Sequence, residues 1–168
     1  MINITTERLF LRPFQGDDFA KVHQLLSDPA VMRSSLKGPY SKQKSLLFIN
    51  QCILKSENNE PSLLAVIDKK NNQLIGSCGF FPQKIQGIEE LELGYRLLKD
   101  YWGKGFATEA AMAVKTYAFK EMGVTRLISL IEKGNNASLR VAEKSGFRLE
   151  KQMLYDGKMS VAIYAATC

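Results

Sequence analysis

The fold is decided by the stretch Leu97-Leu98-Lys99-Asp100-Tyr101-Trp102-Gly103-Lys104-Gly105-Phe106-Ala107-Thr108. A strand ends here, a short turn follows, and a long helix begins. The first amides of a helix have no acceptor within it and, together with the helix dipole, form an anion site. Gly103 and Gly105 allow positive φ and close backbone approach, and Lys104 adds positive charge. The stretch predicts a phosphate-binding turn, although the glycines alone are equally typical of a simple tight turn.

The glycine spacing narrows the ligand. It matches neither the G-x-G-x-x-G of dinucleotide-binding folds nor the G-x-x-x-x-G-K-[ST] of nucleoside triphosphatases. One charge-assisted hydrogen bond contributes roughly 1.5–3 kcal/mol, so several backbone amides suffice to hold a pyrophosphate. No metal ion is needed at such a turn.

The helix after the turn has the strongest pattern in the chain. We expect it from Gly105 to Met122, with Gly123 placed to end it in a left-handed conformation. Its apolar positions share one face and are Ala107, Ala110, Ala111, Val114, Tyr117, Ala118 and Met122. Strands are expected on either side, over residues 89–98 and 125–131.

The rest of the chain alternates strands with single helices. Further helices are expected from residue 17, after an N-cap at Ser41 and over 136–145, the second of them carrying Leu46, Leu47, Ile49, Ile53 and Leu54. Further strands are expected over 8–14, 62–68, 73–81, 147–153 and 159–166. The order β, α, α, β, β, β, α, β, α, β, β indicates an α/β fold with a mixed sheet covered on both faces.

Composition favours one globular domain, residues 1–168, because 45% of the residues are hydrophobic and no linker interrupts the chain. The N-terminus lacks the pattern of a secretory signal, and no apolar run approaches the ~20 residues of a membrane span. We therefore expect a cytoplasmic protein with no membrane partner. The net charge of +6 is spread along the chain, whereas a nucleic-acid binder more often clusters its basic residues or shows a recognised motif, so no nucleic-acid partner is expected. A diffuse positive charge also suits a polyanionic small ligand, and charge alone does not separate the two.

The cysteines and the single histidine do not form a reactive set. Cys52, Cys78 and Cys168 are widely spaced, so neither a disulfide framework nor a zinc site is expected. Cys52 and Cys78 stand in apolar contexts and are interpreted as buried small hydrophobic residues. His23 falls in a predicted amphipathic helix, where packing or a solvated position is expected. The sequence therefore offers no Cys–His nucleophile pair.

Three segments together resemble a known family. They are residues 6–14 (Thr-Glu-Arg-Leu-Phe-Leu-Arg-Pro-Phe), residues 92–110, which begin Glu-Leu-Gly-Tyr and contain the turn, and residues 135–147 (Asn-Asn-Ala-Ser-Leu-Arg-Val-Ala-Glu-Lys-Ser-Gly-Phe). In this order they are similar to the GNAT superfamily of N-acetyltransferases, within it to the branch of ribosomal-protein N-terminal (Rim-type) acetyltransferases. Trp102 takes the first place of the family's [Gln/Arg]-x-x-Gly-x-[Gly/Ala] loop, as is usual in that branch.

The resemblance implies acetyl-CoA as cofactor, in a cleft where two central parallel strands, near 91–98 and 125–131, splay apart. Backbone groups of Leu97 and Leu98 would pair with the pantetheine, although a plain core role is compatible with both. The segment from Trp102 through Gly103, Lys104, Gly105, Phe106 and Ala107 to Thr108 would hold the pyrophosphate. Asn135 would bind the cofactor arm, and Lys144 the 3′-phosphate unless it only lines a solvated helix face.

For the chemistry, the resemblance implies direct attack of a neutral amine on the thioester, without a covalent enzyme intermediate. Glu92 is the candidate base, because alternation puts it on the strand face opposite Leu93; an exposed or salt-bridged glutamate is the alternative. The tyrosine that many GNAT enzymes use as acid is replaced by Ala142. Ser138 is the substitute that the Rim-type branch suggests, unless it only bonds the backbone in the first helical turn.

The acceptor is expected to be a protein or peptide N-terminal α-amine. A small amine, such as a polyamine, amino sugar or drug, and a non-catalytic acyl-CoA-binding module are the alternatives. The loop 32–40, in which Arg33 would meet an acidic acceptor, and the segment 80–87 are expected to border the cleft. The protein would act as a monomer or a homodimer.

Overall fold

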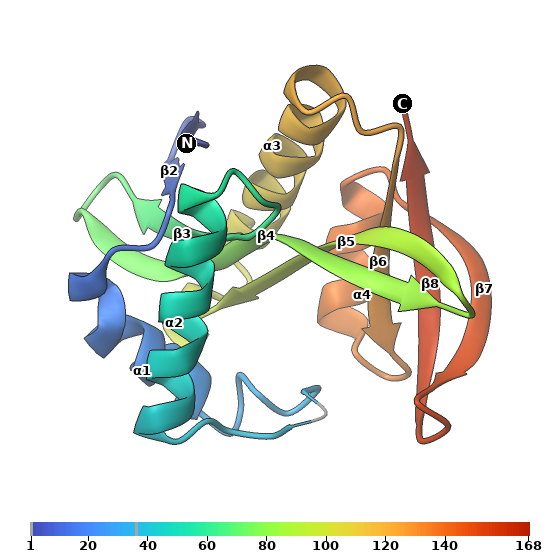
Figure 1. Ribbon diagram of the computed structural model, residues 1–168, viewed down its shortest axis with the longest axis horizontal. Helices are drawn as coiled ribbons and strands as arrows, with labels where there is room; N and C mark the ends of the chain where they lie inside the picture. The colour runs from blue at the N-terminus through green and yellow to red at the C-terminus, as the bar shows by residue number, and fades with distance from the viewer. Residues whose placement is uncertain (1, 36) are drawn as a thin grey trace.

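The computed structural model of the protein describes residues 2–35 and 37–168 (Figure 1). The strands are β1 (Ile4–Thr5), β2 (Leu9–Arg12), β3 (Leu63–Asp68), β4 (Gln73–Ile85), β5 (Ile88–Leu97), β6 (Arg126–Glu132), β7 (Arg148–Tyr155) and β8 (Met159–Thr167). The helices are α1 (Phe19–Ser27), α2 (Lys42–Glu57), α3 (Phe106–Glu121) and α4 (Asn136–Lys144). The strands form one sheet in the order β1-β2-β3-β4-β5-β6-β8-β7. The α/β class and the order of the predicted elements are confirmed.

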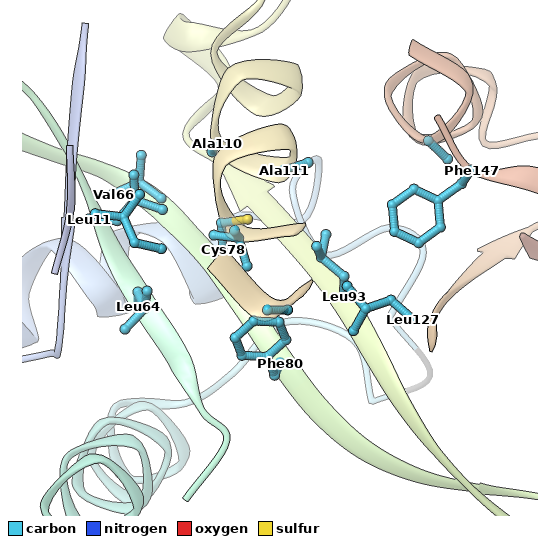
Figure 2. Close-up of a cluster of buried hydrophobic side chains, with 14 of the residues drawn as sticks. Leu11, Leu64, Val66, Cys78, Phe80, Leu93, Ala110, Ala111, Leu127 and Phe147 are labelled. Carbon is cyan, nitrogen blue, oxygen red and sulfur yellow. The ribbon is translucent and has the colours of Figure 1, made fainter. Parts of the chain in front are cut away.

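Both faces of the sheet are covered, as β3 shows residue by residue. Leu63, Ala65 and Ile67 face a core formed with α1 and α2, whereas Leu64 and Val66 face the core beneath α3. Figure 2 shows the second core, in which strand residues from β2 to β6 converge below Ala110 and Ala111 of α3. The strand is buried along its whole length because each face has its own helical layer.

Helix α3 matches its predicted face. Ala110, Ala111, Val114 and Ala118 are fully buried. Gly123 has φ of 66°, and the Val124 amide donates to the Ala118 carbonyl at 3.1 Å, which closes the helix as predicted. The helix begins at Phe106, one residue later than expected, because Gly105 is its left-handed N-cap.

Helix α2 departs from its predicted face. Ser41 caps it as expected, its hydroxyl accepting from the Lys44 amide at 3.2 Å. However, the leucines counted as core positions, Leu46, Leu47 and Leu54, are about half exposed. The buried stripe instead runs through Ser45, Ile49 and Cys52. Ser45 is tolerated inside because its hydroxyl meets Nδ1 of His23 at 3.0 Å.

Two strand boundaries also differ from the prediction. β1 is only two residues long, too short to show a period in the sequence. Residues 80–85, expected in a border loop, continue β4 and pair with β5 from Phe80↔Leu93 to Ile85↔Ile88. The segment expected to be a loop is therefore part of a strand in the β4–β5 hairpin.

Among the strands that the structure describes, only β5 and β6 pair in parallel. This junction contains a single pair, Glu92↔Ile128, although the two strands have 10 and 7 residues. All other neighbouring strands pair antiparallel. The predicted splayed central pair is confirmed.

No helix in residues 2–35 and 37–168 is long and apolar enough to cross a membrane.

Candidate active site

The turn before α3 has the backbone that its glycines predict. Gly103 has φ of 70° and Gly105 φ of 81°, a region that L side chains rarely adopt. No atom lies within 4 Å of the place a Cβ would take at Gly103. The backbone of the turn is therefore open to a ligand on that side.

The start of α3 presents free amides. The Glu109 amide, bonded to the Gly105 carbonyl at 3.0 Å, makes the first helical bond. The amides of Phe106, Ala107 and Thr108 have no acceptor among the described residues, as expected for a first turn. No group of three or more His, Cys, Asp or Glu side chains in the described part of the chain is placed to hold a metal. These amides fit an anion such as the pyrophosphate of coenzyme A.

Two side chains of the turn fold back onto its own start. The Trp102 indole donates to the Leu97 carbonyl at 2.8 Å, with its ring about half exposed. Lys104 Nζ donates to the Asp100 carbonyl at 2.7 Å and lies 5.7 Å from the centroid of the Tyr101 ring. Trp102 therefore fixes the turn against the end of β5, and Lys104 must leave Asp100 to reach a phosphate.

The edge of β5 that faces β6 is the natural backbone site for an extended ligand arm. The Leu98 amide donates to Ile75 of β4 at 2.8 Å, and its carbonyl accepts from the Tyr101 amide. By alternation, the backbone groups of Leu97 and Tyr95 point to the opposite edge, where no β6 pair follows Glu92↔Ile128. The predicted contact with pantetheine thus suits the amide of Leu97, whose carbonyl already accepts from the Trp102 indole, whereas Leu98 can offer only a second lone pair of its carbonyl.

Arg8, from the segment before β2, holds the turn from outside. Its guanidinium donates to the Lys104 carbonyl at 2.9 Å and to Glu109 Oε2 at 2.7 Å, and lies 4.3 Å from the centroid of the Phe106 ring. Glu109 also accepts from the Thr6 hydroxyl at 2.6 Å. In a trans peptide the carbonyl and the following N–H point in opposite directions, so this contact aims the Gly105 amide away from Arg8.

We predict that Arg8→Gln weakens coenzyme A binding by about 5- to 10-fold, the value of one partly exposed ionic contact with its carbonyl bond. The reason is indirect, since Arg8 would act by orienting the turn. Calorimetry on Arg8→Gln, Glu109→Gln and the double variant tests this. The double variant should bind about as weakly as the weaker single variant; fully additive losses would contradict the coupling.

Lys144 reaches the same region from α4. It lines a hollow of about 380 Å³ together with Gly105, Thr108, Glu109 and Met112. The structure thus places Lys144 next to the predicted pyrophosphate turn. Because the side chain is exposed, the role at the 3′-phosphate stays a prediction beside the alternative of a solvated helix face.

The start of α4 is tied to two other parts of the molecule. Asn135 caps the helix, its Oδ1 accepting from the Ser138 amide at 3.2 Å, and its Nδ2 donates to Ser34 Oγ at 3.3 Å. The Ser138 carbonyl accepts from the Tyr95 hydroxyl at 2.7 Å. Ser138 is partly buried beside β5, and its hydroxyl makes none of the described hydrogen bonds. Tyr95, which the sequence placed only by alternation, is thus the residue that fastens β5 to α4.

Arg33 is exposed in the loop between α1 and α2. Figure 1 shows this loop extending away from both helices toward the β6–α4 segment. The bond from Asn135 to the neighbouring Ser34 fixes that approach. The predicted acceptor residue therefore lies in a loop that reaches the start of α4.

Glu92 sits at the single point where β5 and β6 pair. Its Oε2 accepts from Gln83 Nε2 at 2.7 Å, and its Oε1 lies 3.4 Å from the Leu130 amide. Gln83 in turn accepts from the Tyr155 hydroxyl at 3.2 Å. Burial raises the pKa of Glu92 from 4.5 to about 7, against the opposing effects of Gln83, Leu130 and Arg96. A carboxyl group with this pKa can exchange a proton near neutral pH.

Ion pairs hold β5 and β6 together at the end of the pair where the two strands do not splay. Arg126 of β6 bonds Glu90 of β5 at 3.0 Å and Glu150 of β7 at 2.8 Å. Glu90 lies two residues before Glu92, so this bridge is on the side of the junction away from the turn. It fixes where the strands begin to part.

An amide-rich turn that follows a splayed strand is the arrangement that the resemblance to the GNAT N-acetyltransferases implied. Residues 8–148 match the model of the acetyltransferase (GNAT) domain, and the chain belongs to this family. The enzyme class inferred from the sequence, an N-acetyltransferase using acetyl-CoA, is thereby confirmed.

Individual relatives agree with this assignment. An uncharacterized protein of Bacillus subtilis, YkkB, is 34% identical over 96% of this chain and 93% of its own length. The uncharacterized N-acetyltransferase YnaD of the same organism is 34% identical over 89% of this chain and 84% of its own. A GNAT-family acetyltransferase structure from Bacillus anthracis superposes with a TM-score of 0.86 at 31% identity, covering 99% and 98% of the two chains.

Proposed function

We propose that the protein acetylates the N-terminal α-amine of a protein or peptide, with Glu92 accepting the amine's proton through water. The observation that carries the proposal is the place of Glu92, at the only β5–β6 pair and on the strand that leads into the amide-rich turn. Bound acetyl-CoA would supply the thioester carbon that the amine attacks. The free amides of the turn, with Lys104 and Lys144, would bind the phosphates, while Leu97 and Asn135 would position the arm.

The acidity of the acceptor favours an α-amine. An N-terminal amine has a pKa of ~7.7–8.0, so its neutral form costs only about 1 kcal/mol at pH 7. A lysine-like amine, at ~10.4, costs about 4.6 kcal/mol. A carboxylate with a pKa of about 7 is a sufficient base for the first and a weak one for the second.

Departure of the thiol makes only a small demand on an acid. A thiol of pKa ~8.5 costs about 2 kcal/mol to release as thiolate at pH 7. Ser138, partly buried at the start of α4, is our candidate donor. The absence of a tyrosine at Ala142 is therefore compatible with turnover.

Relatives support two kinds of acceptor. A ribosomal L7/L12 alpha-N-protein acetyltransferase in complex with coenzyme A has the same fold, with a TM-score of 0.83 at 22% identity. The spermidine N(1)-acetyltransferase of Escherichia coli is 24% identical over 87% of this chain and 76% of its own. Because the second protein acts on a polyamine, a small cationic amine is the second candidate acceptor.

A thiol-release assay separates the two candidates. The panel contains peptides with a free N-terminus, the same peptides with a blocked N-terminus and an internal lysine, spermidine and an amino sugar. We expect turnover only for free N-termini. Activity on spermidine with none on any peptide would reject the proposal in favour of the second candidate.

A further inference from the structure

Arg96 of β5 shares a strand face with Glu92. The cross-strand pairs Ser77↔Arg96, Gly79↔Gly94 and Phe81↔Glu92 place both charged residues on the face that carries α1 and α2. Between them, Gly94 has no side chain, and the Phe81 ring lies over it, 2.7 Å from where a Cβ would be. Between the two charged side chains, the face of β5 is therefore covered by an aromatic ring rather than by another polar group.

Arg96 differs from the paired arginines of the molecule. Arg8, Arg12 and Arg126 each have a carboxylate oxygen within 3.0 Å. Arg96 is partly buried, yet no carboxylate of residues 2–35 and 37–168 lies within 4.0 Å of it, and none of their described hydrogen bonds involves its guanidinium. Burial lowers its pKa, against the nearby Tyr40 and Glu92. A guanidinium in this situation has strong donors without an acceptor.

The surroundings of Arg96 belong to the acceptor side of the site. Tyr40 ends the loop between α1 and α2, and its amide is fixed to the Leu26 carbonyl at 2.8 Å. The same loop contacts the start of α4 through Ser34 and Asn135. Arg96 thus lies on the strand face of the predicted base and near Tyr40, at the end of the loop that we expect to border the acceptor.

We propose that Arg96 binds a carboxylate of the acceptor, so that the enzyme selects amines that carry an acidic group, such as a peptide with Glu or Asp beside its N-terminus. This inference rests on the proposed function and narrows its substrate class. Arg pairs with carboxylate through two parallel hydrogen bonds, which fixes orientation as well as position. Along β5, Glu92 and Arg96 are about 13 Å apart at Cα, a span that two long side chains narrow to the size of a small zwitterion.

The same charge disfavours polyamines. A polyamine that offers one neutral amine to Glu92 brings a second, protonated amine toward Arg96. Like charges in a poorly solvated site repel more strongly than in water. The proposal therefore predicts that spermidine is a poor acceptor for this enzyme.

The test uses matched peptides that have Glu or Gln as second residue. For the wild type, we expect kcat/KM to favour the Glu peptide by about 10-fold or more, the usual minimum for a hydrogen-bonded charge pair. Arg96→Gln should remove this preference by lowering only the value for the Glu peptide. Arg148→Gln, an exposed arginine of β7, is the charge-matched control and should behave as the wild type.

A binding measurement keeps this test separate from catalysis. Calorimetry on protein saturated with coenzyme A compares the N-acetylated Glu and Gln peptides, with wild type and Arg96→Gln. Preferential binding of the Glu peptide that the variant loses would support the acidic site even if no peptide were turned over. Equal binding of the two peptides by the wild type would overturn the proposal and leave N-terminal acetylation standing.

Discussion

Replacing Gly105 with valine is expected to weaken coenzyme A binding by roughly 100-fold or more, because at least two charge-assisted bonds to the turn would be lost. Valine at φ of 81° is strained, and its Cβ would lie 3.3 Å from the Arg8 guanidinium. The turn must then rotate, which moves the amides of Phe106, Ala107 and Thr108 out of register with the phosphates. Calorimetry with coenzyme A measures the loss directly.

The strain itself needs a control, since a left-handed valine costs about 1–2 kcal/mol wherever it stands. Gly157, in the turn between β7 and β8, has φ of 65° and open space around its Cβ position. Gly157→Val should lower the melting temperature about as much as Gly105→Val but leave coenzyme A affinity unchanged. Equal affinity in the two variants would remove the turn as the binding site.

The parts of the fold that the sequence predicted well are those coded locally. The turn between β5 and α3 follows from two glycines that need positive φ, and the end of α3 from Gly123. The face of α3 follows from small residues at helical spacing, all of which pack on one sheet. Glu92 was placed on the correct face by alternation alone.

What the sequence did not predict depends on distant partners. Arg8 contacts Lys104 across 96 residues of chain, and nothing local to either residue indicates the pair. The predicted stripe of α2 was right at Ile49 but missed Ser45, whose hydroxyl lies 3.0 Å from Nδ1 of His23 in α1. Arg96 was also missed as a candidate, because an arginine without a carboxylate partner is evident only once its surroundings are known.

Burial of Glu92 also makes the stability of the folded protein depend on pH. An ionised carboxylate at this place is disfavoured, so the folded protein binds a proton there at a pH where the unfolded chain does not. The residue that suits the proton transfer is therefore one that lowers stability above neutral pH. Structure and proposed function oppose each other at one side chain, as is common for catalytic groups.

Glu92→Gln is expected to lower kcat by about 100-fold or more, the usual contribution of a general base. In the wild type, kcat should rise with pH through about 7, because only the carboxylate form accepts a proton. The variant should lack this limb and keep only the rise that comes from the acceptor amine itself, at ~7.7–8.0. A wild-type pH profile retained by Glu92→Gln would exclude Glu92 as the base, even if the variant were slower.

With rising pH, Glu92→Gln should become more stable relative to the wild type. Because the pKa of Glu92 is raised in the folded state, its favourable contribution is complete below 4.5 and is lost as pH rises through about 7. Above that pH the wild type carries a cost of up to about 3 kcal/mol that glutamine avoids. Denaturant unfolding at pH 5 and pH 8 should show Glu92→Gln gaining on the wild type at the higher pH.

Glu109 is the matched control. Although burial raises the pKa of Glu109, bonds from Thr6 and Arg8 lower it overall. Glu109→Gln should therefore lose stability at the pH where Glu92→Gln gains it.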